Sequence, residues 1–216
     1  LEKDSKFNEF IKQKKIKKYI FAKKLLGQII FCYFLQKKGC LGANKNQNLG
    51  AGNKNFLRDQ FCKYEIKKKN FYNDFLEYFF YKGLNTENAN NYVESIQCKT
   101  PYLNGGLFEE IEGYNWQKES LKISNEIFSN ETKSGILDIF DLYNFTVDEN
   151  DDFEVEIGID PEMLGKVFEN LLPENFRKGK GSFYTPRKIV KFMCVEVLKN
   201  YLLSKPELKS KSDFII

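Results

Sequence analysis

An apolar stripe with the period of an α-helix is the feature that most limits how this chain can fold. Apolar side chains recur three and four residues apart, on one helical face, at Ala22, Leu25, Leu26, Ile29, Ile30 and Tyr33. Gly39 follows as a helix stop. We therefore predict a helix with a break over residues 6–38. The apolar run Leu25–Leu35 is shorter than the roughly 20 residues that cross a bilayer, so no membrane span is expected.

Similar stripes predict further helices along the rest of the chain. They cover residues 55–69, 70–80 (with Asn70 as its cap), 120–129, 135–143, 160–173 and 185–201. Short strands are expected only at 145–147, at 153–157 and at the end of the chain. The predicted fold is therefore mainly α, an irregular multi-helix domain with a few short strands. We expect residues 1–158 to form a helical scaffold and linker domain, and residues 159–216 a helical lead-in to a further domain.

The absence of histidine excludes several kinds of chemistry. Ser-His-Asp and Cys-His catalysis, His-ligated zinc and imidazole acid–base chemistry all need that side chain. The five cysteines are odd in number and contain no C-x-x-C, which favours buried free thiols over a zinc site or a disulfide framework. We therefore expect a cytoplasmic location. The chain starts at Leu1, and we expect it to be a piece of a longer protein.

Charge divides the chain into three segments. Residues 1–82 carry a net charge of +12, residues 83–162 a net charge of −14, and residues 163–216 a net charge of +6. A basic segment with interleaved aromatic residues is typical of nucleic-acid binding. Only three of the 34 basic residues are Arg, the usual reader of base edges, so a Lys-rich composition is the alternative explanation.

Two acidic patterns suggest metal chemistry, and both have simpler interpretations. Glu65-Ile66-Lys67 has the E-x-K spacing of metal-dependent nucleases but lies in a predicted helix rather than at a strand end. The acidic run 148–152 lacks the Gly-bearing loop and the ordered spacing of a calcium site. The helical setting argues against the first pattern, and a solvated turn explains the second, so no metal site is predicted.

Four tracts in order resemble one family. They are LLGQIIFCYFLQKKG at residues 25–39, NFYNDFLEYFF at 70–80, PYLNGGLF at 101–108, and DPEMLGKVFENLL followed by GSFYTPRKIVKFM within 159–193. Together they resemble the helical region that precedes the catalytic domain of DNA adenine-N6 methyltransferases. The nearest kin are single-chain type IIG restriction–modification enzymes and BREX-type phage-defence methyltransferases.

The resemblance implies a cofactor-side role for the F-Y-T-P tract. Phe183, Tyr184, Thr185 and Pro186 would border S-adenosylmethionine in the parent protein. Thr185 can cap the following helix, whose free N–H groups suit the cofactor carboxylate. The ring of Tyr184 can pack on the adenine or on the sulfonium. Helix capping alone is the simpler explanation of a Thr-Pro pair.

The chain lacks the family's catalytic motifs. It contains no D-P-x-x-G-x-G loop for the cofactor and no [D/N]-P-P-[Y/F] for the flipped base. We therefore expect an inactive fragment of a DNA methyltransferase, with the downstream domain and double-stranded DNA as partners of the parent protein. A non-enzymatic helical nucleic-acid-binding module is the alternative, and a structural domain whose acidic middle meets a basic partner is a third.

Overall fold

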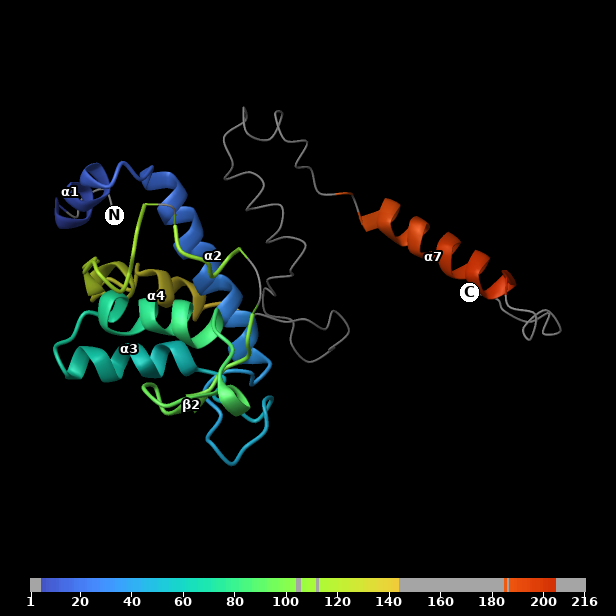
Figure 1. The fold of residues 1–216 in the computed structure, drawn as a ribbon, viewed down its shortest axis with the longest axis horizontal. Coiled ribbons are helices and arrows are strands. Elements are labelled where there is room, and N and C mark those ends of the chain that lie inside the picture. Colours follow the sequence, from blue (N-terminus) through green and yellow to red (C-terminus); the bar gives the residue numbers. More distant parts are fainter. Residues whose placement is uncertain (1–4, 104–105, 112, 144–184, 186, 205–216) are drawn as a thin grey trace. The chain divides into compact units, whose positions relative to one another are not determined.

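A computed structural model describes residues 5–103, 106–111, 113–143, 185 and 187–204 of the chain. Over these ranges the protein is mainly helical, which confirms the predicted fold class (Figure 1). The chain divides into two compact units, Leu1–Leu164 and Gly165–Ile216. Among the described residues, no helix combines the length and the apolar character that crossing a membrane requires.

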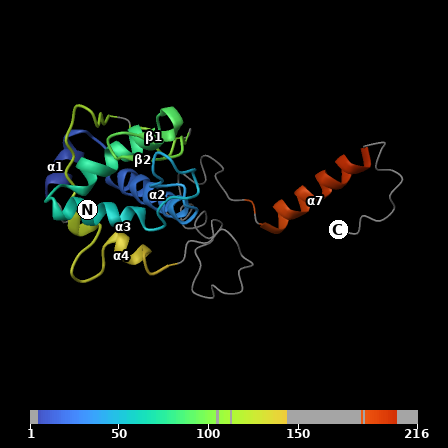
Figure 2. The ribbon, with the colours of Figure 1, turned by 90° about the horizontal axis from the view of Figure 1, so that it is seen from below.

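The predicted N-terminal helix is two helices. Helix α1 covers Ser5–Gln13 and α2 covers Lys18–Lys37, so the expected break falls in the turn between them. The stripe residues Leu25, Ile29, Ile30 and Tyr33 are buried as predicted. Residues off the stripe are buried too: Phe21, Gln28, Cys32 and Gln36. Other elements therefore enclose α2 on several sides, as the two ribbon views show (Figures 1 and 2).

Helix α3, Phe56–Ile66, forms an antiparallel pair with the helical segment that follows it. That segment begins at Phe71 and includes two π-helical stretches, η1 (Tyr72–Leu76) and η2 (Phe79–Leu84). Phe56 at the start of α3 lies 5.5 Å from Phe79, ring centroid to centroid, while Phe61 lies 5.1 Å from Phe71. This reversed order of contacts fixes the antiparallel register. The π-helical stretches were not predicted.

Side chains satisfy backbone groups at the starts of both helices. Asn70 Oδ1 accepts a hydrogen bond from the Asn73 N–H at 2.9 Å, which confirms Asn70 as the predicted cap. At α3 the neighbouring residue Asn55 makes no capping bond. Instead Gln36 of α2 reaches across, and its Oε1 accepts the buried Leu57 N–H at 2.9 Å. A buried glutamine thus joins the end of α2 to the start of α3.

Two predictions about the middle of the chain are wrong. A small hairpin, β1 (Tyr92–Val93) and β2 (Cys98–Lys99), follows the 3-10 turn η3 (Ala89–Asn91) where no strand was expected. The predicted helix 120–129 contains only the 3-10 turn η4, Asn125–Ile127. Leu121 and Ile123 are buried while Lys122 and Ser124 are exposed. This period of two belongs to an extended segment, and it overrides the helical pattern.

Other predictions have mixed outcomes. Helix α4, Ile136–Phe140, lies within the predicted 135–143. The strands expected at 145–147 and 153–157, the helix at 160–173 and the final strand lie outside the described residues.

All five cysteines are free, but only Cys32 and Cys98 are buried, whereas Cys62 and Cys194 are exposed. The prediction of buried thiols is therefore wrong for these two, which lie on solvent-facing helix sides.

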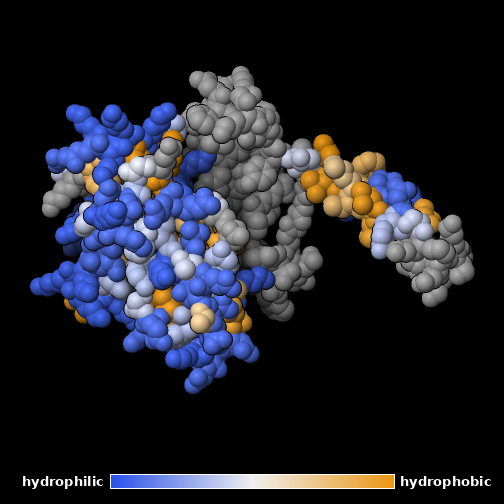
Figure 3. Space-filling view, viewed as in Figure 1, coloured by the Kyte–Doolittle hydropathy of each residue, from blue (hydrophilic) through white to orange (hydrophobic). Residues whose placement is uncertain are grey.

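Helix α7, Arg187–Ser204, is the described helix of the second unit. Its predicted apolar face is largely exposed and includes Val190, Met193, Val197, Leu198 and Tyr201. In the space-filling view, hydrophobic residues are prominent on α7, whereas hydrophilic residues cover most of the visible face of the first unit (Figure 3).

Candidate functional site

The structure describes one of the four residues expected beside the cofactor. Thr185 is exposed and lies two positions before the start of α7. Phe183, Tyr184 and Pro186 lie outside the described residues. The exposed Thr185 hydroxyl at the entry to a long helix is compatible with the expected role, and it is equally compatible with capping.

Three of the four tracts that carry the resemblance meet in the first unit. Residues 25–39 belong to α2, and residues 70–80 belong to the helical segment that pairs with α3. The buried ring of Phe108, from the PYLNGGLF tract, lies 6.1 Å from Phe31 of α2 and 5.6 Å from Phe80. One aromatic side chain therefore joins segments that are far apart in sequence.

Polar bonds hold the same tract against α2. The Gln28 amide donates to the Leu107 carbonyl at 2.9 Å, and the Lys24 ammonium donates to the Gly106 carbonyl at 3.1 Å. Partial burial lowers the pKa of Lys24, and the nearby carboxylate of Glu109 opposes that shift. Gly106 itself has an ordinary φ, and an added Cβ there would meet only Glu109 Oε2, at 3.6 Å.

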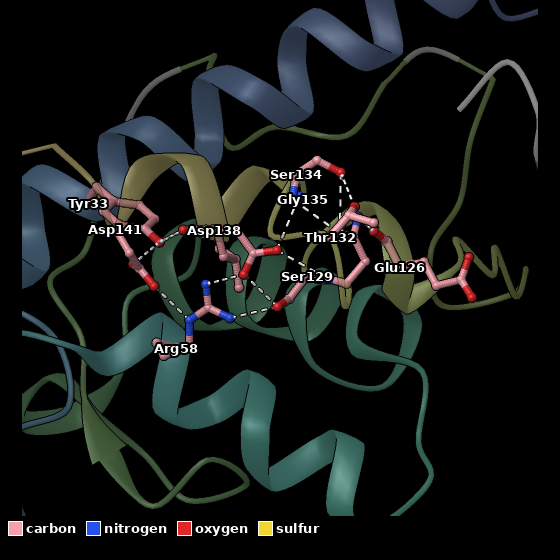
Figure 4. A network of polar contacts seen from close by, with 11 residues as sticks. Tyr33, Arg58, Glu126, Ser129, Thr132, Ser134, Gly135, Asp138 and Asp141 are labelled. Carbon is pink, nitrogen blue, oxygen red and sulfur yellow. Dashed lines mark hydrogen bonds and ion pairs between the residues drawn. The ribbon is translucent and has the colours of Figure 1, made fainter.

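The strongest polar cluster in the described residues centres on Arg58 of α3 (Figure 4). Its Nε donates to Asp141 at 2.7 Å, its Nη2 donates to Asp138 at 3.0 Å, and its Nη1 donates to Ser129 Oγ at 2.9 Å. The hydroxyl of Tyr33 donates to the other oxygen of Asp141 at 2.7 Å. These bonds tie α2, α3 and α4 together, and each guanidinium nitrogen has a partner.

Asp138 is the buried acid of this cluster, with only 2% of its side chain exposed. Burial by itself would raise its pKa. The hydroxyl of Ser129, the N–H of Asn130, Arg58 and the N–H of Gly135 all donate to the carboxylate, and together they lower its pKa to about 2. The charged form is therefore strongly held, which identifies a structural anchor rather than a proton donor.

Glu77 is a buried acid of the opposite kind. Its side chain is 1% exposed, Asn73 donates to Oε2 at 2.9 Å, and Oε1 has no hydrogen-bond partner among the described residues. Burial raises its pKa to about 8, and the charge of Asp74 adds to that effect, while the bond from Asn73 opposes it. The Glu77 carboxyl is therefore mostly protonated at neutral pH.

The substitution Glu77→Gln is expected to stabilise the protein at alkaline pH. The unfolded chain ionises Glu77 near pH 4.3, whereas the folded chain does so near pH 8, so stability falls as the pH rises between these values. A neutral amide removes that loss of stability, which is at most about 4–5 kcal/mol at pH 8 and is small at pH 4. Urea unfolding at both pH values measures this difference in the free energy of unfolding. Glu65→Gln on the exposed side of α3 is the control, and equal pH profiles for Glu77→Gln and the unsubstituted chain would contradict the prediction.

Neither the Arg58 cluster nor the buried Glu77 was predicted from the sequence. Arg58 carries a signal, because it is one of three arginines in a chain whose other basic residues are all lysines, and arginine suits paired carboxylates. Its partners are about 80 residues away, so the sequence does not identify them. No group of three His, Cys, Asp or Glu side chains that could hold a metal ion occurs in the part of the chain that the structure describes.

Comparison with known proteins gives one relative. It is a protein of Methanocaldococcus jannaschii with the provisional name type II restriction enzyme and methyltransferase, 29% identical over 198 residues. The match covers 86% of this chain but only 15% of the relative, so the chain spans a small part of that protein. No family model and no solved structure matches the chain. The similarity supports a relationship to restriction–modification proteins.

Proposed function

We propose that the chain is the helical scaffold and linker segment of a DNA adenine-N6 methyltransferase that belongs to a restriction–modification system. The observation that carries this proposal is the similarity over 86% of the chain to a relative named as a restriction enzyme and methyltransferase. The joining of residues 25–39, 70–80 and 101–108 by Phe108 supports it. In this proposal the chain alone does not methylate DNA, and a downstream catalytic domain and double-stranded DNA are its partners.

The F-Y-T-P tract is proposed to form one side of the S-adenosylmethionine pocket in the parent protein. The cofactor, when bound, supplies the methyl group. Thr185 would orient it through the exposed hydroxyl at the entry to α7, and Tyr184 would pack an aromatic ring against its adenine or its sulfonium. Phe183 and Pro186 would support these two residues from the sides of the tract.

Replacing both Tyr184 and Thr185 by Ala in the full-length protein is expected to weaken cofactor binding at least about tenfold, because a stacking contact and a hydroxyl bond are both lost. Isothermal titration with S-adenosylmethionine measures this loss of affinity. The conservative double variant Tyr184→Phe with Thr185→Ser is the matched control and is expected to keep most of the affinity. Unchanged affinity in the double Ala variant would contradict the pocket role.

A non-enzymatic nucleic-acid-binding module is the second candidate function. The net charge of +12 in residues 1–82 favours it. This candidate requires the chain by itself to bind duplex DNA with an affinity that falls steeply as salt rises. Fluorescence anisotropy with a labelled duplex at 20 mM and 200 mM salt tests that requirement. Methylation of duplex DNA by the full-length protein separates the two candidates, because a non-enzymatic module transfers no methyl group.

A further inference from the structure

Lysines concentrate in the turn between α1 and α2. Five of the seven residues from 12 to 18 are lysine. Lys14 is half-buried and pairs with Glu119. The other four, Lys12, Lys15, Lys17 and Lys18, are exposed and have no ion pair with an acidic side chain within the described ranges. Most of this charge therefore faces solvent without an acidic partner among the described residues.

The position of Lys17 and Lys18 costs stability within the chain. Lys17 is the N-cap of α2 and makes no capping bond, and Lys18 is the first helical residue, with no acidic residue in the first turn. Positive charge is unfavourable at a helix N-terminus, where the dipole is already positive. At the end of α3 the opposite holds, because Lys63 lies in the last turn and Lys67, Lys68 and Lys69 follow it. Internal stabilisation therefore explains the lysines after α3 and Lys12 in the last turn of α1, but not Lys17 and Lys18.

The turn also shapes a hollow in the surface. Asn8, Glu9, Ile11, Lys12, Ile16 and Lys18 line a depression of about 540 Å³. Backbone bonds hold it in place, since the Ile16 N–H donates to the Ile11 carbonyl at 3.1 Å and Lys15 has a φ of +55°. Tyr19 and Ile20 follow at the surface, 42% and 40% exposed. The ordered concave face combines lysines with apolar contacts, and Glu9 is its one carboxylate.

We propose that residues 12–18 form a contact surface for the phosphate backbone of duplex DNA. The proposal rests on the proposed function, which makes DNA the partner, and it names the part of the first unit that meets it. Lysines act as point charges toward phosphates, and phosphate contacts position a protein without reading sequence. The surface therefore positions the protein on the duplex, and other parts of the parent protein recognise the bases.

Two matched triple variants of the full-length protein test the proposal. In the first, Lys15, Lys17 and Lys18 are each changed to Gln, and in the second Lys67, Lys68 and Lys69 are. Each triple removes three exposed charges and includes one residue with positive φ, Lys15 or Lys68. The first triple is expected to reduce the slope of log affinity against log salt by about 2 to 3. The second is expected to change it by less than about 0.5.

The outcomes are distinguishable. Equal losses in both triples would mean a diffuse positive field and would overturn the proposal. Normal DNA affinity in the first triple, with weaker binding to phosphatidylserine vesicles, would assign the surface to a membrane instead. If the protein methylates DNA and the first triple leaves the salt slope unchanged, the surface proposal fails and the proposed function stands. If the protein neither binds duplex at low salt nor methylates it, both fail.

Discussion

Replacing Arg58 by Met is expected to lower the free energy of unfolding by about 3 kcal/mol at pH 7. Methionine keeps an apolar stem of similar length but removes the guanidinium that bonds to Asp138, Asp141 and Ser129. Removing one partner of a buried pair leaves the other charge uncompensated, which costs about 3–5 kcal/mol. The cost here lies at the lower end, because Arg58 is 23% exposed and Asp138 keeps three other hydrogen bonds.

The loss of Arg58 also changes the dependence of stability on acid. The pKa of Asp138 is about 2 in the folded protein and near 3.9 when unfolded. The free energy of unfolding that Asp138 contributes through this lowered pKa is therefore complete above pH 4 and disappears as the pH falls toward 2. Without Arg58 the folded pKa rises toward its usual value, so this contribution becomes smaller. We expect the difference between Arg58→Met and the unsubstituted chain to shrink between pH 4 and pH 2.

Urea unfolding followed by tryptophan fluorescence measures both effects. Trp116 is the single tryptophan of the chain, and its ring stacks on Tyr81 with centroids 5.8 Å apart, so it reports on packing in the first unit. Lys63→Met on the exposed side of α3 is the control and is expected to shift stability by less than about 1 kcal/mol, because it removes only a charge at a helix end. A double-mutant cycle with Asp141→Asn isolates the pair. Additive effects would mean that Arg58 and Asp141 do not interact.

The Arg58 cluster illustrates which features of the fold the sequence could predict. Helical periodicity is local, so the stripe at residues 22–33, the stop at Gly39 and the cap at Asn70 were predicted from neighbouring residues. The partners of Arg58 are set by how α3 and α4 pack, which no local pattern encodes. The extended segment at 121–124 was missed for the same reason, because the burial of Leu121 and Ile123 depends on distant helices.

The cofactor-side residues show a different limit. Phe183, Tyr184, Thr185 and Pro186 were expected beside S-adenosylmethionine from a resemblance and not from a local pattern. In the proposed function the rest of that pocket belongs to another domain, so the composition of this chain cannot identify it. Their role therefore stays a prediction that the titration experiment tests. The lysines at 12–18 were visible in the sequence, but only the fold places Lys17 and Lys18 at a helix start, unlike the lysines at the end of α3.

Replacing Gly39 by Ala is expected to destabilise the protein by about 3 kcal/mol or more. Gly39 has a φ of +67°, and an added Cβ would overlap the carbonyl oxygen of Gly50. The Gly39 carbonyl also accepts the N–H groups of Gly50 at 2.9 Å and Gly52 at 2.8 Å. Left-handed backbone costs a residue with a Cβ about 1–2 kcal/mol, and overpacking adds about 1–3 kcal/mol. Because the clash is with backbone, no change of rotamer relieves it.

Three further glycines separate the two causes. Gly52 has an ordinary φ, but its Cβ would overlap the Leu41 carbonyl oxygen, so Gly52→Ala measures the steric cost alone. Gly50 has a φ of +106° with no atom within 4 Å of an added Cβ, so Gly50→Ala measures the backbone cost alone. Gly106→Ala carries neither the steric cost nor the backbone cost. Urea unfolding is expected to rank Gly39→Ala as the least stable, then Gly52→Ala and Gly50→Ala, with Gly106→Ala unchanged. A Gly39→Ala variant as stable as Gly106→Ala would contradict the close approach between the end of α2 and the loop that leads to α3.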